Sequence, residues 1–321
     1  MKKKHAGTAT LRSPSGFEVT VIDVGAALQS IVVPTASGPL ECILGYNDPA
    51  AYRSDPYYVG ATVGRFANRI RGGRIIVDAT AYQLDVNEVS TGNCLHGGTD
   101  GFHRQRFDID YEPNSTVLVC RHVSPAGAQG FPAEVCVDVT YRLVGDYGLS
   151  IEFVATADAA TVISMANHAY FNLDRHKGRI DAHQLSVAAS RYTPVDEMQI
   201  PTGEIASVDD SIFDLRIMAE LATRSFDHNF VSDGEAGEIR VLANLYSPDS
   251  GVGLSVHSTQ SALQVYTGDF LDTPFATRQG IALEAQNFPD SPNQKGFPSA
   301  RLAPGETYRQ QTIYEFTLPR Q

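Results

Sequence analysis

Two segments of the sequence place an ionisable side chain among apolar neighbours. SMANHAYFNL (164–173) begins like a buried strand yet carries His168 at its centre, and IALEAQNFPDSPN (281–293) runs from small apolar residues into Glu284. An unpaired buried polar group costs about 1–3 kcal/mol. Burial also raises the pKa of a carboxyl toward values useful to a general base. His168 is therefore either a hydrogen-bonded core histidine or a residue that faces a cavity and takes part in a reaction. For Glu284 the alternatives are an ion pair with an arginine or the same kind of reactive role.

His96 and Asp227 add a second imidazole and a second carboxylate. His96 precedes two glycines in NCLHGGTDGFH, and glycines let the backbone turn sharply, so the imidazole can point into a cleft. A turn with an exposed histidine is the alternative. Asp227 lies between two phenylalanines in FDHNF. His103 follows His96 by seven residues, but neither has a carboxylate or a third imidazole at the spacing that zinc or iron sites show. We therefore expect no metal.

The run GRFANRI (64–70) presents Arg65, Asn68 and Arg69 beside glycine and short strands. Arg and Asn offer several fixed donors, which suits a polyhydroxylated ligand; surface Arg–carboxylate pairs explain them equally well. Aromatic residues Tyr170 and Phe288 accompany the polar groups. The sequence has no nucleophile elbow, P-loop or dinucleotide fingerprint. Together the set fits acid–base chemistry on a carbohydrate.

The elements that must hold these groups are strands. Apolar and polar residues alternate with period two in five segments, and long helical stripes are hard to find; the segments are 17–25, 115–123, 133–144, 149–158 and 251–259. No linker or charged run divides residues 1–321, so the pattern predicts one large all-β domain of the sandwich type. Polar stretches without alternation, where a β-scaffold keeps its binding groups, are 60–74, 87–107 and 284–297.

Composition excludes several classes of partner. The formal charge is −12, from 25 Lys+Arg and 37 Asp+Glu, without a basic block, which disfavours nucleic acid and anionic membranes. We expect no secretion signal, because no apolar stretch follows the opening lysines, and no membrane span. The four widely spaced cysteines are typical of reduced thiols in a cytoplasmic protein; they are Cys42, Cys94, Cys120 and Cys136.

A series of motifs in fixed order closely resembles the aldose 1-epimerase (galactose mutarotase) family. The matching pieces span about residues 17–293 and read GRFANRI, NCLHGG, NHAYFNL, YTPVDEMQIPTGEI, FDLR, FDHNF, LQVYTGDFL and EAQNFPDSPN. The resemblance implies an antiparallel β-supersandwich and a cofactor-free isomerase. Its substrate is a small-molecule monosaccharide: the enzyme interconverts the α and β anomers of free aldoses such as galactose and glucose.

The resemblance also implies roles for individual residues. Glu284 matches the family's base and His168 its acid. For His168 to donate a proton near neutral pH, a carboxylate should hold it charged. The residues implied to bind or line the sugar site are Asn68, Arg69, His96, Tyr170, Asp227 and Gln264.

Several positions depart from the common family pattern. His103 stands where Asp is common, Phe107 where Trp is common, and Ala169 and Ala285 where a hydroxyl residue is common. We expect all of them near the site, which leaves open the preference among galactose, glucose, xylose and arabinose.

Other functions and states also stay open. A glycoside hydrolase would use two carboxylates, Asp227 and Glu284. A non-catalytic sugar-binding β-sandwich is a further alternative. A hexose 6-phosphate enzyme is disfavoured because no added basic cluster is present. The chain is expected to be a monomer or a homodimer.

Overall fold

Antiparallel strands make up most of the regular secondary structure of the protein, a computed structural model that describes residues 7–319. No α-helix forms within this range. The helical elements are six short 3-10 turns: η1 (Pro49–Arg53), η2 (Arg71–Gly73), η3 (Phe102–Arg104), η4 (Ala128–Gly130), η5 (Ile180–Ala182) and η6 (Ser291–Asn293). None of the described helices is long and apolar enough to cross a membrane. The all-β prediction is confirmed.

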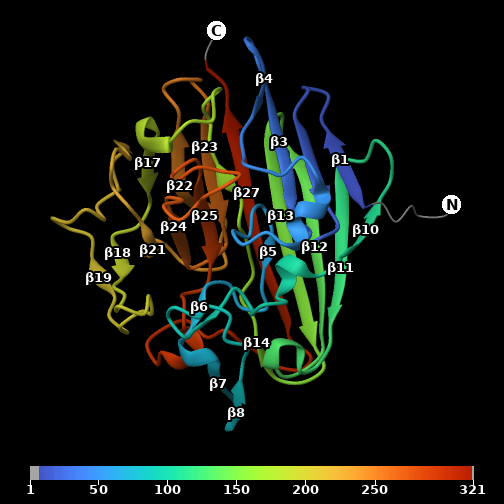
Figure 1. Cartoon of the computed structure of the whole chain (residues 1–321), viewed down its shortest axis with the longest axis vertical. Helices are drawn as coiled ribbons and strands as arrows, with labels where there is room; N and C mark the ends of the chain where they lie inside the picture. Colours follow the sequence, from blue (N-terminus) through green and yellow to red (C-terminus); the bar gives the residue numbers. More distant parts are fainter. Residues whose placement is uncertain (1–6, 320–321) are drawn as a thin grey trace.

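The largest sheet has nine antiparallel strands and runs through the whole molecule (Figure 1). In spatial order its strands are β10 (Asp108–Tyr111), β11 (Val117–Ser124), β12 (Val135–Val144), β13 (Gly148–Ala157), β27 (Thr307–Thr317), β23 (Gly253–Ser258), β22 (Arg240–Tyr246), β17 (Gln184–Val187) and β20 (Ala219–Glu220). The C-terminal strand β27 lies in the middle of this sheet, so the end of the chain joins its two halves.

Two further sheets pack with the large one. The N-terminal sheet comprises β1 (Thr8–Arg12), β2 (Glu18–Ile22), β3 (Leu28–Thr35) and β4 (Gly38–Glu41). A six-stranded sheet has the order β16 (Tyr170–Phe171), β25 (Ile281–Gln286), β24 (Ala262–Tyr266), β21 (Asp227–Val231), β18 (Arg191–Thr193) and β19 (Ala206–Ser207). One apolar core cluster joins residues of all three sheets.

Four two-stranded ladders complete the fold, several of them at the lower end of Figure 1. They pair β5 (Thr62–Val63) with β15 (Ala166–Asn167), β6 (Arg69–Ile70) with β9 (Cys94–Leu95), β7 (Arg74–Val77) with β8 (Thr80–Gln83), and β14 (Thr161–Val162) with β26 (Arg301–Leu302). Short strands of this kind bring loops from distant parts of the sequence together at one place.

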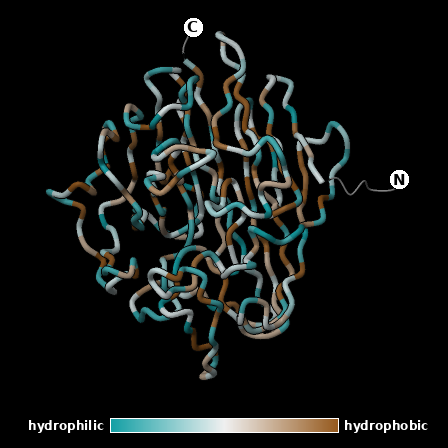
Figure 2. The backbone as a smooth tube through the Cα atoms, in the orientation of Figure 1, coloured by the Kyte–Doolittle hydropathy of each residue, from teal (hydrophilic) through white to brown (hydrophobic). Residues whose placement is uncertain are grey.

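Alternating burial explains why the sequence forms these sheets. In β12 the inward side chains are buried while their neighbours are more exposed; the buried ones are Val135, Val137, Val139 and Tyr141. The tube in Figure 2 shows apolar residues recurring along the strands. β25 differs, because all its residues from Ile281 to Gln286 are buried. This strand contains Glu284, so the fold places a carboxyl where water is excluded.

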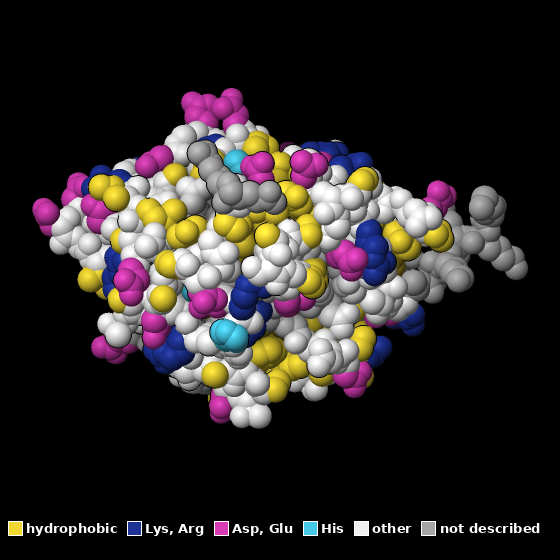
Figure 3. Space-filling model, turned by 90° about the horizontal axis from the view of Figure 1, so that it is seen from above, with side chains coloured by type: hydrophobic (Ala, Val, Ile, Leu, Met, Phe, Trp, Pro, Cys, Tyr) yellow, Lys and Arg dark blue, Asp and Glu magenta, His cyan; other side chains and the backbone are white. Residues whose placement is uncertain are grey.

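The distribution of surface charges and the state of the cysteines agree with what the composition indicates. On the face seen in Figure 3, Lys and Arg side chains are interspersed with Asp and Glu, without a continuous basic patch on that face. All four cysteines are unpaired; Cys136 is exposed and the other three are buried.

Arg65, from the GRFANRI run, is a structural residue. Its Nε donates to Ser124 Oγ at 3.0 Å, and its Nη1 donates to the carbonyls of Pro132 at 2.7 Å and Ala133 at 2.9 Å. Its Nη2 donates to the carbonyls of Ser124 at 2.9 Å and Pro125 at 2.7 Å. Burial lowers the pKa of Arg65 to about 10, so it stays charged at neutral pH. The guanidinium thus binds a loop instead of a ligand.

We predict that Arg65→Lys lowers the free energy of unfolding by about 2–4 kcal/mol, because one ammonium cannot reach acceptors on both sides of a planar fork. Denaturant unfolding measures the effect. Arg309→Lys is the control: Arg309 is 62% exposed and pairs with Glu152, so the change should stay within about 0.5 kcal/mol. Equal effects of the two substitutions would contradict the structural role of Arg65.

Candidate active site

A cavity of about 240 Å³ opens beside the six-stranded sheet. It is smaller than the roughly 300–1,000 Å³ of sites for drug-sized ligands, so it suits one small molecule. Larger hollows of about 810 and 510 Å³ lie elsewhere and contain neither His168 nor Glu284. The residues lining the smaller cavity are Pro56, Tyr57, Tyr58, Asn68, Arg69, Glu88, Leu95, His96, His168, Tyr170, Asp227, Tyr266, Phe270 and Glu284.

The strand register of the six-stranded sheet determines which side chains form much of the cavity wall. Directly paired residues on neighbouring strands lie side by side, and residues two apart on a strand share a face. Two such rows cross β21, β24 and β25 on one face, the first continuing onto β16: Asp227–Tyr266–Ala282–Tyr170 and Asn229–Gln264–Glu284. The two carboxylates predicted from the sequence therefore come from strands that share this face.

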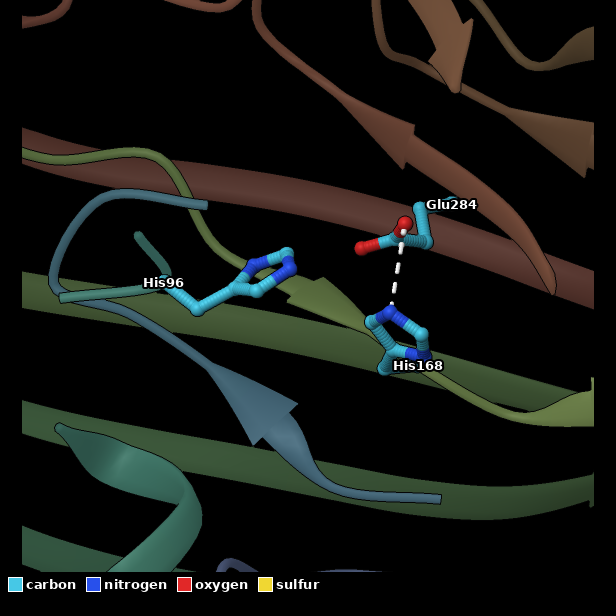
Figure 4. A group of neighbouring side chains, drawn as sticks. All are labelled: His96, His168 and Glu284. Carbon is cyan, nitrogen blue, oxygen red and sulfur yellow. Dashed lines mark ion pairs between the residues drawn. The ribbon is translucent and has the colours of Figure 1, made fainter. Parts of the chain in front are cut away.

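His168 and Glu284 meet inside the cavity. His168 follows β15, and its Nε2 lies 3.6 Å from Glu284 Oε1 (Figure 4). The two residues are 4% and 2% exposed, respectively. His168 Nδ1 and Glu284 Oε2 have no hydrogen-bond partner among the described residues. The pair thus forms one contact and keeps further polar atoms for a ligand.

Burial controls the charge of this pair. It lowers the pKa of His168 to about 4, although a backbone hydrogen bond and the charge of Asp227 act in the opposite direction. Burial and the negative charge of Asp227 raise the pKa of Glu284 well above its ordinary value, with Arg69 opposing. Desolvation of His168 thus outweighs the attraction of the nearby carboxylate, so the condition for a charged His168 is not met by burial and Asp227 alone. Burial favours the uncharged form of each group, a carboxyl and a neutral imidazole.

His96 approaches the pair as a neutral donor. Its Nδ1 accepts a hydrogen bond of 3.1 Å from the backbone N–H of Asn68, so the proton of the neutral ring is on Nε2. Burial, with the nearby His168 and Arg69, lowers the pKa of His96 well below its ordinary value. In Figure 4 one ring nitrogen of His96 points toward the His168–Glu284 pair. This geometry presents an N–H to whatever occupies the cavity.

The three side chains in Figure 4 also lie close enough together to hold a metal ion. Ligand atoms of His96, His168 and Glu284 lie within 4.8 Å of one another. A metal needs an imidazole lone pair, however, and the Asn68 hydrogen bond already uses that of His96 Nδ1 and leaves a proton on Nε2. The trio therefore fits hydrogen bonding to a polar ligand better than metal coordination.

Arg69 connects Glu88 and Asp227, which both line the cavity. Its Nε and Nη2 bind the Glu88 carboxylate, with Nη2 at 2.8 Å, and its Nη1 lies 3.3 Å from Asp227 Oδ2. Asp227 Oδ1 accepts a 2.6 Å hydrogen bond from Gln264 Nε2. Burial alone would raise the pKa of Glu88, but Arg69 holds it below its ordinary value. The result is a fixed ionic network at the cavity wall.

The structure brings together most of the residues predicted from the sequence. Seven of the eight line the cavity: Asn68, Arg69, His96, His168, Tyr170, Asp227 and Glu284. Gln264 is absent from the lining and instead holds Asp227. Their roles in binding and catalysis stay predictions.

Several residues that the sequence analysis placed around the site do not line the cavity. Phe288 packs against Phe297, with ring centroids 5.0 Å apart. Of the departures from the family pattern, Ala169 and Ala285 directly follow His168 and Glu284 in the chain, and the ring of His103 packs on Tyr58. Phe107 is buried against His122. Strand and core packing, which the motif positions do not reveal, separates these side chains from the cavity.

The sequence analysis missed several lining residues, notably Tyr58, Glu88, Tyr266 and Phe270. Three of them carried a weak signal, since Phe270 shares a motif with Tyr266. Glu88 lies in the polar stretch 87–107, and Tyr266 lies within the LQVYTGDFL motif. Tyr58 had no such signal, because nothing in its spacing separates it from an ordinary core tyrosine.

A buried imidazole–carboxyl pair with fixed donors around it, in a small cavity of an all-β scaffold, is an arrangement suited to proton transfer on a small polar molecule. The family model described as aldose 1-epimerase matches residues 7–315. The chain belongs to the aldose 1-epimerase family, which confirms the resemblance seen in the motifs.

Known relatives cover nearly the full length of the chain. It is 36% identical over 328 residues to the aldose 1-epimerase of Escherichia coli K12, covering 96% of this chain and 94% of that protein. It is 38% identical over 319 residues to the galactose mutarotase of Mus musculus, covering 94% and 92%. The crystal structure of a GalM/aldose epimerase homologue from C. elegans superposes with a TM-score of 0.92 at 27% identity, covering 98% and 99%.

Glu284→Gln should stabilise the folded protein, and more so at pH 8 than at pH 5. The pKa of Glu284 is raised on folding, so its contribution to stability is fully present below the unfolded value of 4.5 and is lost as the pH rises toward the folded value. Glutamine removes this loss. Thermal unfolding of both proteins at the two pH values measures the difference.

Glu315→Gln is the matched control, because Glu315 lies 3.2 Å from His257 but is 62% exposed. The control should show no comparable gain at pH 8. A Glu284→Gln variant whose stability relative to wild type is lower at pH 8 than at pH 5 would contradict the raised pKa.

Proposed function

We propose that this protein is a mutarotase that interconverts the α and β anomers of free aldohexoses such as galactose and glucose. The observation that carries the proposal is the buried His168–Glu284 pair, 3.6 Å apart, in a cavity sized for one small molecule. Family membership and the names of the relatives support it.

The proposed reaction opens and closes the sugar ring. Ring opening removes the proton of the C1 hydroxyl, protonates the ring oxygen and breaks the bond between C1 and that oxygen. Glu284 as carboxylate takes the first proton and His168 as imidazolium gives the second. Rotation about C1–C2 and the reverse transfers then close the ring on the other face. Positioned acid–base catalysis contributes roughly 10²–10⁴-fold.

The same proton of the His168–Glu284 pair is used for ring opening and for ring closure. The pair that opens the ring consists of a carboxylate and an imidazolium. It contains the same single proton as the form that burial favours, which consists of a carboxyl and a neutral imidazole. After opening, the pair is in the second form, which is the one that closes the ring. Asp227 favours the charge on His168, and Arg69 favours the charge on Glu284. Asp227 also disfavours the charge on Glu284, so Asp227 acts on the two partners in opposite directions, whereas Arg69 stabilises the carboxylate.

The other lining groups are proposed to hold the sugar hydroxyls. His96 donates through Nε2–H. Asp227 and Arg69 present a carboxylate and a guanidinium whose positions are fixed by their mutual contact and by Glu88. Asn68 accepts the backbone N–H of Arg69 on its Oδ1 at 2.8 Å, which leaves its amide N–H groups for a ligand. Tyr170 packs on His168, with ring centroids 4.8 Å apart. Gln264 acts through Asp227. No cofactor is needed for these steps.

The glycoside hydrolase alternative fits this arrangement less well. Both oxygens of Asp227 already accept hydrogen bonds, from Arg69 and from Gln264, which weakens it as a nucleophile or base. A hydrolase using Asp227 and Glu284 would also leave the imidazole facing Glu284 without a role. We expect no release of phenol from aryl glycosides.

The proposal includes the setting of the enzyme. Residues 1–321 are proposed to work as a single domain, since the first and last described strands contribute to one core cluster. A cytoplasmic location is supported by the four unpaired thiols. The protein is proposed to act on free sugars as a monomer or homodimer, without nucleic acid or membrane partners.

The optical rotation of freshly dissolved α-anomers tests the activity. We expect the protein to speed the approach to equilibrium for at least one of galactose, glucose, xylose and arabinose. The order of the four rates gives the sugar preference. No acceleration with any of them would exclude the proposed function.

Glu284→Gln and His168→Asn should each lower kcat by at least about 100-fold, because each removes one partner of the proton transfer. Asp227→Asn and Arg69→Ala should also raise KM. His257→Asn and Glu315→Gln are matched controls from the other His–Glu pair, 3.2 Å apart on the surface of the large sheet, and should leave kcat unchanged. Near-normal turnover by Glu284→Gln would refute its assignment as the base.

A further inference from the structure

Tyr58 is the aromatic residue at the centre of the imidazole cluster. Its ring centroid lies 4.6 Å from that of His96, 4.6 Å from that of His103 and 5.9 Å from that of His168. Tyr58 also lines the cavity. The Tyr58 ring thus touches both histidines that face Glu284 and the third one behind them.

The backbone at Tyr58 is held in an unfavourable conformation. Its φ of 59° is left-handed, which costs a residue with a side chain roughly 1–2 kcal/mol. The neighbouring backbone is fixed by the buried carboxylate of Asp55, which accepts the N–H groups of Tyr57 at 2.9 Å and Val59 at 2.6 Å. Strained residues persist where the surrounding structure determines them, and they cluster at functional sites.

The hydroxyl of Tyr58 is oriented by Asn87. Asn87 Nδ2 lies 3.4 Å from the Tyr58 oxygen and also donates to the carbonyl of Leu95 at 3.0 Å. Asn87 Oδ1 accepts the Leu95 N–H at 2.7 Å. Asn87 is thereby anchored to Leu95, the last residue of β9 and the residue before His96. Burial raises the pKa of Tyr58 to about 12, so the phenol stays uncharged.

His103 supports the other side of the Tyr58 ring. It is 5% exposed, and its surroundings are tight. A Cβ added at Gly25 would lie 2.8 Å from the His103 carbonyl oxygen, and one at Gly101 would lie 3.2 Å from its Nδ1. Burial lowers the pKa of His103 to about 3. Tyr58 therefore packs against a neutral ring at His103.

The contact with His168 matters for the reaction. Two aromatic rings lie near His168, that of Tyr58 with its centroid at 5.9 Å and that of Tyr170 at 4.8 Å. Aromatic rings within about 6 Å attract a cation placed over their faces, and the attraction grows when the site is desolvated. Packing against the two rings restricts the orientation of the imidazole.

We propose that Tyr58, backed by His103, is a positioning residue that fixes the imidazole rings of His96 and His168 for proton transfer. This inference rests on the proposed mutarotase function. It assigns to the Tyr58 ring an effect on kcat, whereas a residue that only binds sugar would change KM.

The test compares Tyr58→Leu with Tyr58→Phe by polarimetric kinetics on the best aldose. The leucine variant should lower kcat by about 10–100-fold with KM within about threefold, because misplacement of a catalytic group by about 1 Å costs up to 100-fold. The phenylalanine variant keeps the ring and should retain kcat within about threefold. Tyr82→Leu, at a half-buried tyrosine outside the cavity, controls for general loss of packing.

His103→Ala provides an independent variant should Tyr58→Leu fail to fold. It should lower kcat in the same direction, and the double variant should lose less than the product of the two single losses, since the residues act through one contact. Normal kcat in folded Tyr58→Leu, or a change confined to KM, would overturn the inference while leaving the proposed function intact. An inactive wild-type protein would instead refute the proposed function itself.

Discussion

The exclusion of water from one carboxyl and one imidazole is the constraint on which the site depends. Glu284 lies in the one strand of its sheet whose residues are all buried over six positions, and His168 meets it from a neighbouring strand end. In water the two groups would ionise independently. Buried together, they share a single proton, and the free-energy cost of separating charge between them is set by the residues around the cavity.

The surrounding charges act on that cost in opposite directions. Arg69 lowers the pKa of Glu284 and Asp227 raises it. The Arg69 guanidinium is itself paired with Glu88 and Asp227. His96 stays neutral because its Nδ1 is occupied by a backbone N–H. The cavity wall is therefore polar without imposing a large net field.

The sequence predicted much of the fold because alternation reports burial directly. The segments 133–144 and 149–158 correspond closely to β12 and β13. Motif order also identified seven cavity residues. What failed depends on contacts between distant segments. The sequence left open whether Arg65 binds a ligand or a carboxylate, and only its carbonyl partners around residues 124–133 show a structural role. The charge of His168 likewise depends on burial by strands far along the chain. Tyr58 was missed for the same reason.

Infrared difference spectroscopy at pH 7 tests the central claim most directly, because it observes the proton on the buried carboxyl. Subtracting the spectrum of Glu284→Gln from that of the wild type should reveal the carbonyl stretch of a protonated carboxylic acid that the variant lacks. A difference spectrum containing only carboxylate bands at pH 7 would contradict the account, since Glu284 would then be ionised in the resting protein.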